Sequence, residues 1–116
     1  MKKINIDIQT NGGTKTVEAW TPNSKSALAV NLSIRNEAGL DKKMGWAVTH
    51  IVSGMAIATK MKTKSEAIQL ARILGNRSEW NLIGDDGDLT NFPSSMKREV
   101  LAITENIKYG RPIVRF

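Results

Sequence analysis

The side chain best suited to acid–base chemistry in this 116-residue sequence is His50, the only histidine. Its unperturbed pKa lies near neutrality, so it could exchange a proton at physiological pH. Its neighbours Thr49 and Ser53 carry hydroxyl groups, but strand alternation turns Thr49 to the opposite face, and no nucleophile is activated. We therefore interpret His50 as a hydrogen-bonded structural residue and predict that the protein is not an enzyme.

Metal and cofactor chemistry has little support in the sequence. The absence of cysteine excludes disulfides, thiolate nucleophiles and cysteine zinc sites. Asp85, Asp86 and Asp88 bring three carboxylates together, but they lack the alternating ligands and terminal glutamate of an EF-hand loop. We expect a solvated turn there, with a bound cation as the alternative. No glycine-rich stretch has the signature of a phosphate loop. The sequence thus predicts no metal and no cofactor.

Positive charge is concentrated in the first part of the chain. The whole sequence carries 17 basic and 11 acidic residues, a net charge of +6. Residues 1–64 hold ten basic and four acidic side chains, whereas residues 65–116 hold seven of each. The segment 42–64 contains five lysines and no acid. Because lysines neutralise phosphates and release counterions, this distribution favours a nucleic-acid partner.

The elements that must position these lysines are predicted to be strands. Up to residue 62, apolar and polar residues alternate with a period of two, which is typical of half-buried strands. Turn residues at 11–13, 22–24 and 53–54 separate the segments, and residues 36–45 read as a polar loop. The pattern predicts five strands, over residues 4–9, 14–21, 28–35, 46–52 and 55–61.

From residue 63 onward the pattern becomes helical. Thr63 and Glu66 have the spacing of a capping box, and Gly75 stands where a left-handed residue would end the helix. A second helix is predicted to begin at Ser94, after an irregular connection over 76–93. One apolar stripe marks each helix: Ala67, Leu70, Ala71 and Leu74 in the first, and Met96, Val100, Ile103 and Ile107 in the second.

These elements predict an α+β fold of order βββββαα. It is a two-layer arrangement, with a mainly antiparallel sheet of about five strands and two helices packed on one face. The length fits a single domain, residues 1–116. Within it, residues 1–62 form the sheet half and residues 63–116 the helical half.

Hairpin parity predicts which side chains share the uncovered face. A two-residue loop at Asn11-Gly12 or Gly12-Gly13 joins Val17 and Ala19 to the isoleucines of the first strand and puts Trp20 on the polar side. In the second hairpin, Ser53-Gly54 as a loop pairs Trp46 with Met61 and Val48 with Thr59. The uncovered face is then predicted to be flat and polar, with these residues on it: Trp20, Asn31, Ser33, Arg35, Ala47, Thr49, Ile51, Ala56, Ala58, Lys60 and Lys62.

Such a face could bind a single strand of nucleic acid with little sequence specificity. A flat aromatic ring offers a stacking surface for a base, and the surrounding cations meet the backbone. The alternative is that these lysines keep the sheet soluble and protect its edges. The candidate nucleic-acid-binding residues are Trp20, Arg35, Lys42, Lys43, Lys60, Lys62 and Lys64.

The competing hypothesis is a protein–protein interaction module, such as an accessory or inhibitory protein of phage or plasmid type. The small residues Ala47, Thr49, Ala56 and Ala58 would make a flat surface that could pair two copies in a homodimer. No apolar run reaches the length of a membrane span, and the first residues do not resemble a signal peptide. We therefore expect a cytoplasmic protein with no membrane partner.

Overall fold

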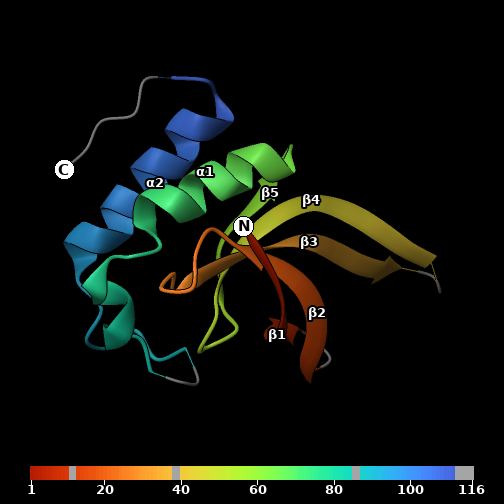
Figure 1. The fold of residues 1–116 in the computed structure, drawn as a ribbon, viewed down its shortest axis with the longest axis horizontal. Helices are drawn as coiled ribbons and strands as arrows, with labels where there is room; N and C mark the ends of the chain where they lie inside the picture. Colours follow the sequence, from red (N-terminus) through yellow and green to blue (C-terminus); the bar gives the residue numbers. More distant parts are fainter. Residues whose placement is uncertain (11–12, 38–39, 85–86, 112–116) are drawn as a thin grey trace.

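Five antiparallel strands followed by two α-helices make up the fold, as the sequence predicted (Figure 1). The computed structural model describes residues 1–10, 13–37, 40–84 and 87–111, and the side chains of residues 10, 34–37 and 40–43 lie outside the described part. The elements are β1 (Lys2–Thr10), β2 (Gly13–Thr21), β3 (Leu28–Glu37), β4 (Leu40–His50), β5 (Ala56–Met61), α1 (Lys64–Leu74), the 3-10 turn η1 (Ser78–Leu82) and α2 (Ser94–Lys108).

The first hairpin has the predicted register. Thr10 pairs with Gly13, so two residues connect the strands, and Ile6 lies opposite Val17. The apolar side chains of β1 and β2 consequently share one face of the hairpin, and Trp20 lies on the other. The strands follow one another in the sheet in the order of the sequence, β1-β2-β3-β4-β5.

The predicted loop over residues 36–45 is wrong. β3 continues to Glu37 and β4 begins at Leu40, so the two strands form a long arm beyond the helices (Figure 1). Backbone pairing in an antiparallel ladder does not require apolar side chains. Residues 36–45 show no regular alternation of apolar and polar residues, so the sequence pattern could not reveal the strands there.

The predicted register of the second hairpin holds only at one end. Trp46 pairs with Met61 as predicted, but Val48 pairs with Ala58 instead of Thr59. The extra residue in β5 forms a bulge, and Lys60 in that segment has a φ of +58°. The bulge turns Ala58 into the core beneath the helices and leaves Thr59 exposed. Val52 belongs to the turn and is 64% exposed.

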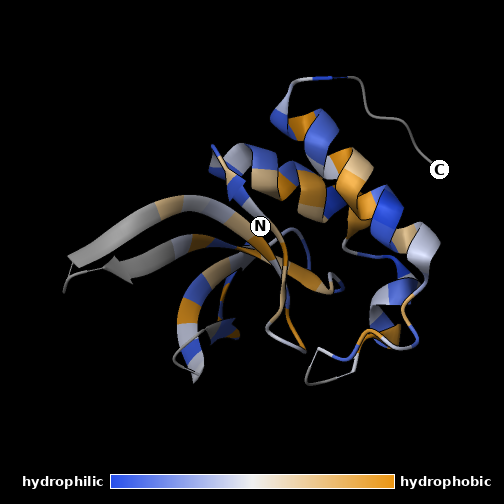
Figure 2. Cartoon of the chain, turned by 180° about the vertical axis from the view of Figure 1, so that it is seen from behind, coloured by the Kyte–Doolittle hydropathy of each residue, from blue (hydrophilic) through white to orange (hydrophobic). Residues whose placement is uncertain are grey.

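The two helices cover one face of the sheet with the predicted apolar stripes. Thr63 caps α1 by accepting a hydrogen bond from the Glu66 backbone N–H. Gly75 is right-handed, with a φ of −64°, so its predicted left-handed conformation is wrong. A Cβ there would lie 2.3 Å from Oγ of Ser26, so close packing accounts for the glycine. Figure 2 shows polar and apolar bands along both helices. The stripes pack onto Leu28, Val30, Val48 and Met61 of the sheet.

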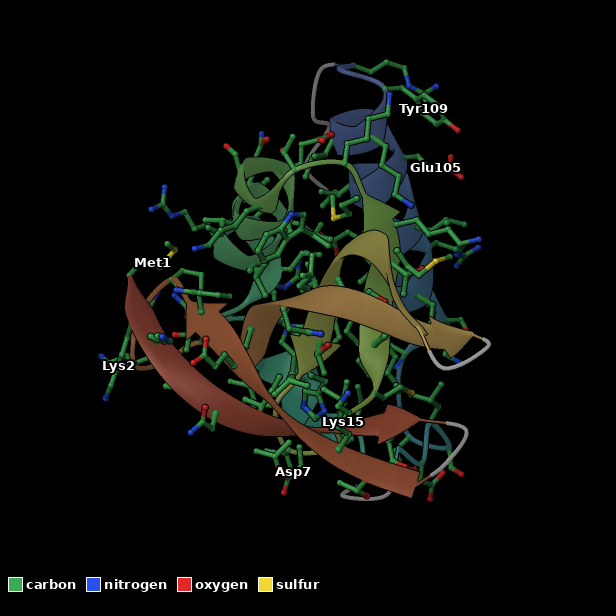
Figure 3. All side chains as sticks on the ribbon, turned by 90° about the vertical axis from the view of Figure 1, so that its right-hand side faces the viewer. Met1, Lys2, Asp7, Lys15, Glu105 and Tyr109 are labelled. Atoms are coloured by element: carbon green, nitrogen blue, oxygen red, sulfur yellow. The ribbon has the colours of Figure 1, made fainter. Side chains whose placement is uncertain are left out.

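The opposite face of the sheet is also covered, so the prediction of a flat, open polar face is wrong. The β1–β2 hairpin curls over it, and Ile6 and Ala19 pack against Ala29 of β3. Figure 3 shows this hairpin curving past the other strands, with Asp7 and Lys15 labelled on it. Asn31 and Thr49 are each 2% exposed, and the Thr49 hydroxyl donates a hydrogen bond to Oδ1 of Asn31. This bond satisfies both polar groups inside the curl.

The curl is closed by a contact between β1 and the β4–β5 turn. The Gln9 backbone N–H donates to the Gly54 carbonyl at 2.9 Å. Gly54 has a φ of +71°, and a Cβ at this position would lie 2.5 Å from the Asp7 carbonyl oxygen. Both constraints favour glycine. Among the described residues, no helix is long and apolar enough to cross a membrane.

Candidate nucleic-acid interface

Trp20 lies on the same side of the sheet as the helices. It pairs with Val30 of β3, whose side chain is buried beneath the helices. The prediction that it shares a face with Asn31 is therefore wrong, since adjacent residues of a strand point to opposite faces. The helices do not extend fully over this end of β2, and Trp20 is half-buried at their border.

Three side chains meet at this border and form what we call the tryptophan–lysine cluster: Trp20, Trp46 and Lys64. Nζ of Lys64 lies 3.7 Å from the centroid of the Trp20 ring and 5.9 Å from that of Trp46. The two indole rings meet edge to face, with centroids 5.9 Å apart and an interplanar angle of 65°. A cation over an aromatic face is stabilised by about 0.5–1 kcal/mol at an exposed site. The cluster thus combines half-exposed aromatic surface with a positive charge.

Strand pairing and a helix cap bring the cluster together. Trp46 pairs with Met61 at the end of β5, and α1 begins three residues later at Lys64. The Thr63 hydroxyl accepts from the Glu66 N–H at 3.1 Å and lies 3.3 Å from the Glu66 carboxylate. This cap fixes the first turn of α1 beside the strands and holds Lys64 above the indole rings.

Lys60 and Lys62 add two exposed cations on either side of Met61. Within the described part of the chain, neither they nor Lys64 form an ion pair with a carboxylate, whereas Lys3 pairs with Glu18 at 3.2 Å. The nearest acid in the sequence, Glu66, is hydrogen-bonded to the Thr63 cap. The positive charge of these three lysines therefore remains available for an external anion.

Arg35, Lys42 and Lys43 belong to the β3–β4 arm. Arg35 pairs with Lys42, and Ile34 pairs with Lys43, but the side chains lie outside the described part. Lys43 is three residues before Trp46 in β4, which corresponds to roughly 10 Å of extended chain. The antiparallel course of β4 and β5 thus joins two lysine groups that are separated in the sequence. Gly45 lies at the register shift of β4 against β3, between Lys43 and Trp46. It has a φ of +87°, and a Cβ on it would lie 2.8 Å from the Met61 carbonyl oxygen.

The surface beside the cluster continues along α1. A shallow depression begins at Lys64 and passes Gln69 to reach Arg72, which is exposed. Arg72 and Trp46 were not among the residues that the sequence predicted for this interface. The predicted Trp46–Met61 pair indicates the position of Trp46 in the sheet, but the sequence gives no sign that its ring is only half-buried. Arg72 has no comparable signal, since its place depends on how α1 docks.

His50 lies away from this surface, in the core beneath the helices. It is 2% exposed, and its Nδ1 lies 2.8 Å from Oγ of Ser53. Burial lowers the pKa of His50 below its ordinary value, and a hydrogen bond with the Trp80 backbone opposes part of that shift. A buried neutral imidazole bonded to a turn serine fits the structural role predicted for it.

The acidic turn shows hydrogen bonding of its own. The Asp88 carboxylate accepts from the backbone N–H and the hydroxyl of Thr90, which lowers the pKa of Asp88. Asp85 and Asp86 lie outside the described residues, and the residues that are described contain no group of three or more candidate metal ligands.

Comparison of the chain with protein-family models, curated proteins and solved structures found no match.

Proposed function

We propose that this protein binds nucleic acid, preferentially single-stranded and with little sequence specificity, and that it does so without catalysing a reaction. The observation that carries the proposal is the tryptophan–lysine cluster with Lys60 and Lys62 beside it. The surface differs from the flat face expected from the sequence: it runs along the border of the helices, from the β3–β4 arm to α1.

The cations support an interaction with the phosphate backbone. Lys60, Lys62 and Lys64 stand close together without carboxylate partners in the described part of the chain. Each phosphate that such a lysine neutralises releases condensed counterions. Arg72 and the basic residues of the arm extend this charge in two directions, so one strand could follow the surface over several nucleotides.

The indole rings support a preference for single strands. A base in a duplex is stacked on its neighbours, whereas an unpaired base can stack on an aromatic side chain. The Lys64 ammonium occupies one face of the Trp20 ring. In the proposed complex a base takes this position, and Lys64 moves to the adjoining phosphate. Trp46 then supports Trp20 from its edge, and stacking on any base accounts for low sequence specificity.

The proposal is tested by the affinity for a fluorescently labelled 20-nucleotide oligothymidine at several salt concentrations. We expect the triple variant Lys60→Ala/Lys62→Ala/Lys64→Ala to bind at least about tenfold more weakly at low salt. The slope of log K against log salt should fall by about 2, because each single-strand phosphate contact contributes about 0.7. Trp20→Ala should lose about 1–3 kcal/mol of binding free energy. A duplex of equal length should bind more weakly than the single strand.

The matched control is Lys2→Ala/Lys15→Ala/Lys25→Ala, which removes the same charge from exposed positions outside the cluster. Its affinity should change by less than about threefold, since distant exposed charges are screened. Equal weakening in both triple variants would show that only net charge matters. That result, or no binding at low salt, would contradict the proposal.

The competing protein–protein hypothesis loses the surface on which it rested. Ala47, Thr49 and Ala58 are at most 7% exposed, and Ala56 is the one exposed member of the four, so these residues offer no flat surface for pairing two copies. A different feature of the structure favours a protein partner, and it lies at β5 and α2.

A further inference from the structure

An apolar groove of about 420 Å³ runs between β5 and α2. Its floor includes Trp80, Ile83 and Phe92 of the connection between the helices, all of which are buried. Leu101 stands at its rim and is 60% exposed. This volume is within the range of about 300–1,000 Å³ that ligand sites occupy. The groove shares no lining residue with the tryptophan–lysine cluster.

The groove follows the edge of the sheet. β5 is the last strand in the order β1-β2-β3-β4-β5, and among the described residues no strand pairs with its second edge. Five consecutive residues, 55–59, line the groove. Met55, Ile57 and Ala58 of this stretch belong to the core beneath the helices, and β5 is the outer strand of the sheet, so the groove lies beside its outer edge. Such an edge can accept an added strand.

Two lysines bracket the groove on α2. Lys97 and Lys108 lie on one helical stripe with Leu101 and Thr104, and no carboxylate stands among the described residues of the lining. Eleven residues of helix separate the two lysines, which corresponds to roughly 16 Å. Five to six residues of extended chain span a similar length, roughly 16–20 Å. The charges therefore match a short extended segment with an acidic residue near each end.

A buried hydroxyl in the lining lacks a partner. Thr104 is 6% exposed, and its Oγ1 is the buried side-chain polar atom without a hydrogen bond among the described residues. A buried polar group without a partner is destabilising. A ligand in the groove that brings a polar backbone group to Thr104 would remove this deficit.

We propose that the β5–α2 groove binds an extended acidic segment of a partner protein. The backbone of the segment adds to β5 as a sixth strand, and its aliphatic side chains lie against the groove floor. Its two terminal carboxylates pair with Lys97 and Lys108. A polar group of its backbone bonds to Thr104. This proposal does not depend on nucleic-acid binding.

The test uses the peptide acetyl-Asp-Val-Ser-Val-Ser-Val-Asp-amide as a probe in NMR titrations of the full chain. We expect shifts confined to residues 55–59 and the facing side of α2, together with slower amide exchange in β5. A peptide with both aspartates replaced by lysine should bind at least about tenfold more weakly at low salt, since two favourable charge pairs become repulsive. N-methylation of the central valine should also abolish binding, because it blocks the strand hydrogen bonds.

Charge exchange separates the role of the lysines from an effect on folding. The variant Lys97→Glu/Lys108→Glu should lose affinity for the aspartate peptide and gain affinity for the lysine peptide. The control Lys15→Glu/Lys25→Glu changes the same charge away from the groove and should keep the original preference. Thr104→Val retains the shape of the side chain. It should lower the affinity for the aspartate peptide about fivefold, which corresponds to the loss of one hydrogen bond.

Three results would overturn the proposal. The first is the absence of shifts at β5 and α2 with millimolar aspartate peptide. The second is an unchanged peptide preference after charge exchange. The third is dimerisation of the protein alone that Leu101→Glu abolishes, which would identify a second copy of the chain as the occupant. Oligothymidine binding is tested with a different variant, the lysine triple variant. Either proposal can therefore fail without affecting the test of the other.

Discussion

At the scale of single residues, His50 shows how burial changes the chemistry of a side chain. The ring is 2% exposed and is bonded to Ser53 in the turn that follows β4. It also lies near the Trp80 indole, with ring centroids 6.1 Å apart. Removing the imidazole from water disfavours its charged form. The same residue that the sequence offers for proton transfer therefore serves as a neutral part of the core.

This burial makes folding stability depend on pH. The pKa of His50 in the folded protein is below its value of 6.5 in a model compound. As the pH falls below 6.5, the unfolded chain takes up the proton first, so the free energy of unfolding should decrease. Above that pH the residue is neutral in both the folded and the unfolded state, so it does not change the free energy of unfolding with pH. Urea unfolding between pH 5 and 8 measures this change, and NMR titration of the single imidazole measures the pKa directly.

The control for the pH dependence is His50→Gln, which keeps a hydrogen-bonding side chain but does not titrate. We expect this variant to be less stable overall and to lose the decrease between pH 6.5 and 5. If wild type and variant show the same slope over this range, another group titrates and the account of His50 is wrong.

At the scale of elements, β4 and α2 each carry a buried threonine with opposite consequences. The Thr49 hydroxyl of β4 donates to Asn31 at 2.8 Å inside the curl. The Thr104 hydroxyl of α2 has no hydrogen-bond partner in the described part of the chain. The first bond holds β3 to β4 through their side chains, whereas the second hydroxyl lines a groove whose proposed occupant supplies the partner.

The same substitution should therefore change stability in opposite directions. Thr49→Val leaves the Asn31 oxygen without its donor and should cost about 1–3 kcal/mol of unfolding free energy. Thr104→Val removes an unsatisfied hydroxyl at nearly constant volume and should add about 1 kcal/mol. Urea denaturation measures both, and each variant serves as the control for the other. A loss of stability in both would contradict the assignment of Thr104 as unpartnered.

The elements differ in how well the sequence predicted them. One face of α1 and one face of α2 are covered along the whole helix, so each apolar stripe is complete. The bounds predicted from these stripes therefore agree closely with the structure. The β3–β4 arm has no regular alternation of apolar and polar residues over 36–45, and the sequence therefore predicted a loop there. Two irregularities shift β5 against β4, by one residue at Val48 and by two at Thr49, and a simple two-residue alternation cannot anticipate such insertions.

At the scale of the whole molecule, the sheet is stabilised by curling on itself. The β1–β2 hairpin folds over the face opposite the helices, and Ile6 is 4% exposed in the small core that results. Gln9 and Gly54 close the curl through a backbone hydrogen bond. The sheet therefore has a covered layer on each side, although only one layer is helical.

Closing the curl should depend on the glycine at position 54. Gly54→Ala places a Cβ against the Asp7 carbonyl, at 2.5 Å in the native backbone. We expect a loss of about 3 kcal/mol or more, because strain at positive φ adds to a backbone clash. Gly110→Ala is the control, since its φ of +65° is similar and no atom of the described residues lies within 4 Å of the added Cβ. It should cost about 1 kcal/mol.

Thermal and urea unfolding of the two glycine variants give this comparison. The Gln9 amide should also exchange faster in Gly54→Ala, because its bond to the Gly54 carbonyl is weakened. Equal losses of stability in both variants would show that the contact between β1 and the β4–β5 turn does not constrain the fold.

Local pattern by itself determined the order of elements, the two helices with their buried stripes, the register of the first hairpin and the lysine-rich segment. These follow from interactions between residues a few positions apart, which the sequence displays directly. Only the tertiary structure decided that the hairpin covers the second face, that Trp20 meets Trp46 and Lys64, and that a groove opens beside β5. Those contacts join distant segments, and sheet curvature and bulges set their geometry, which no local periodicity records.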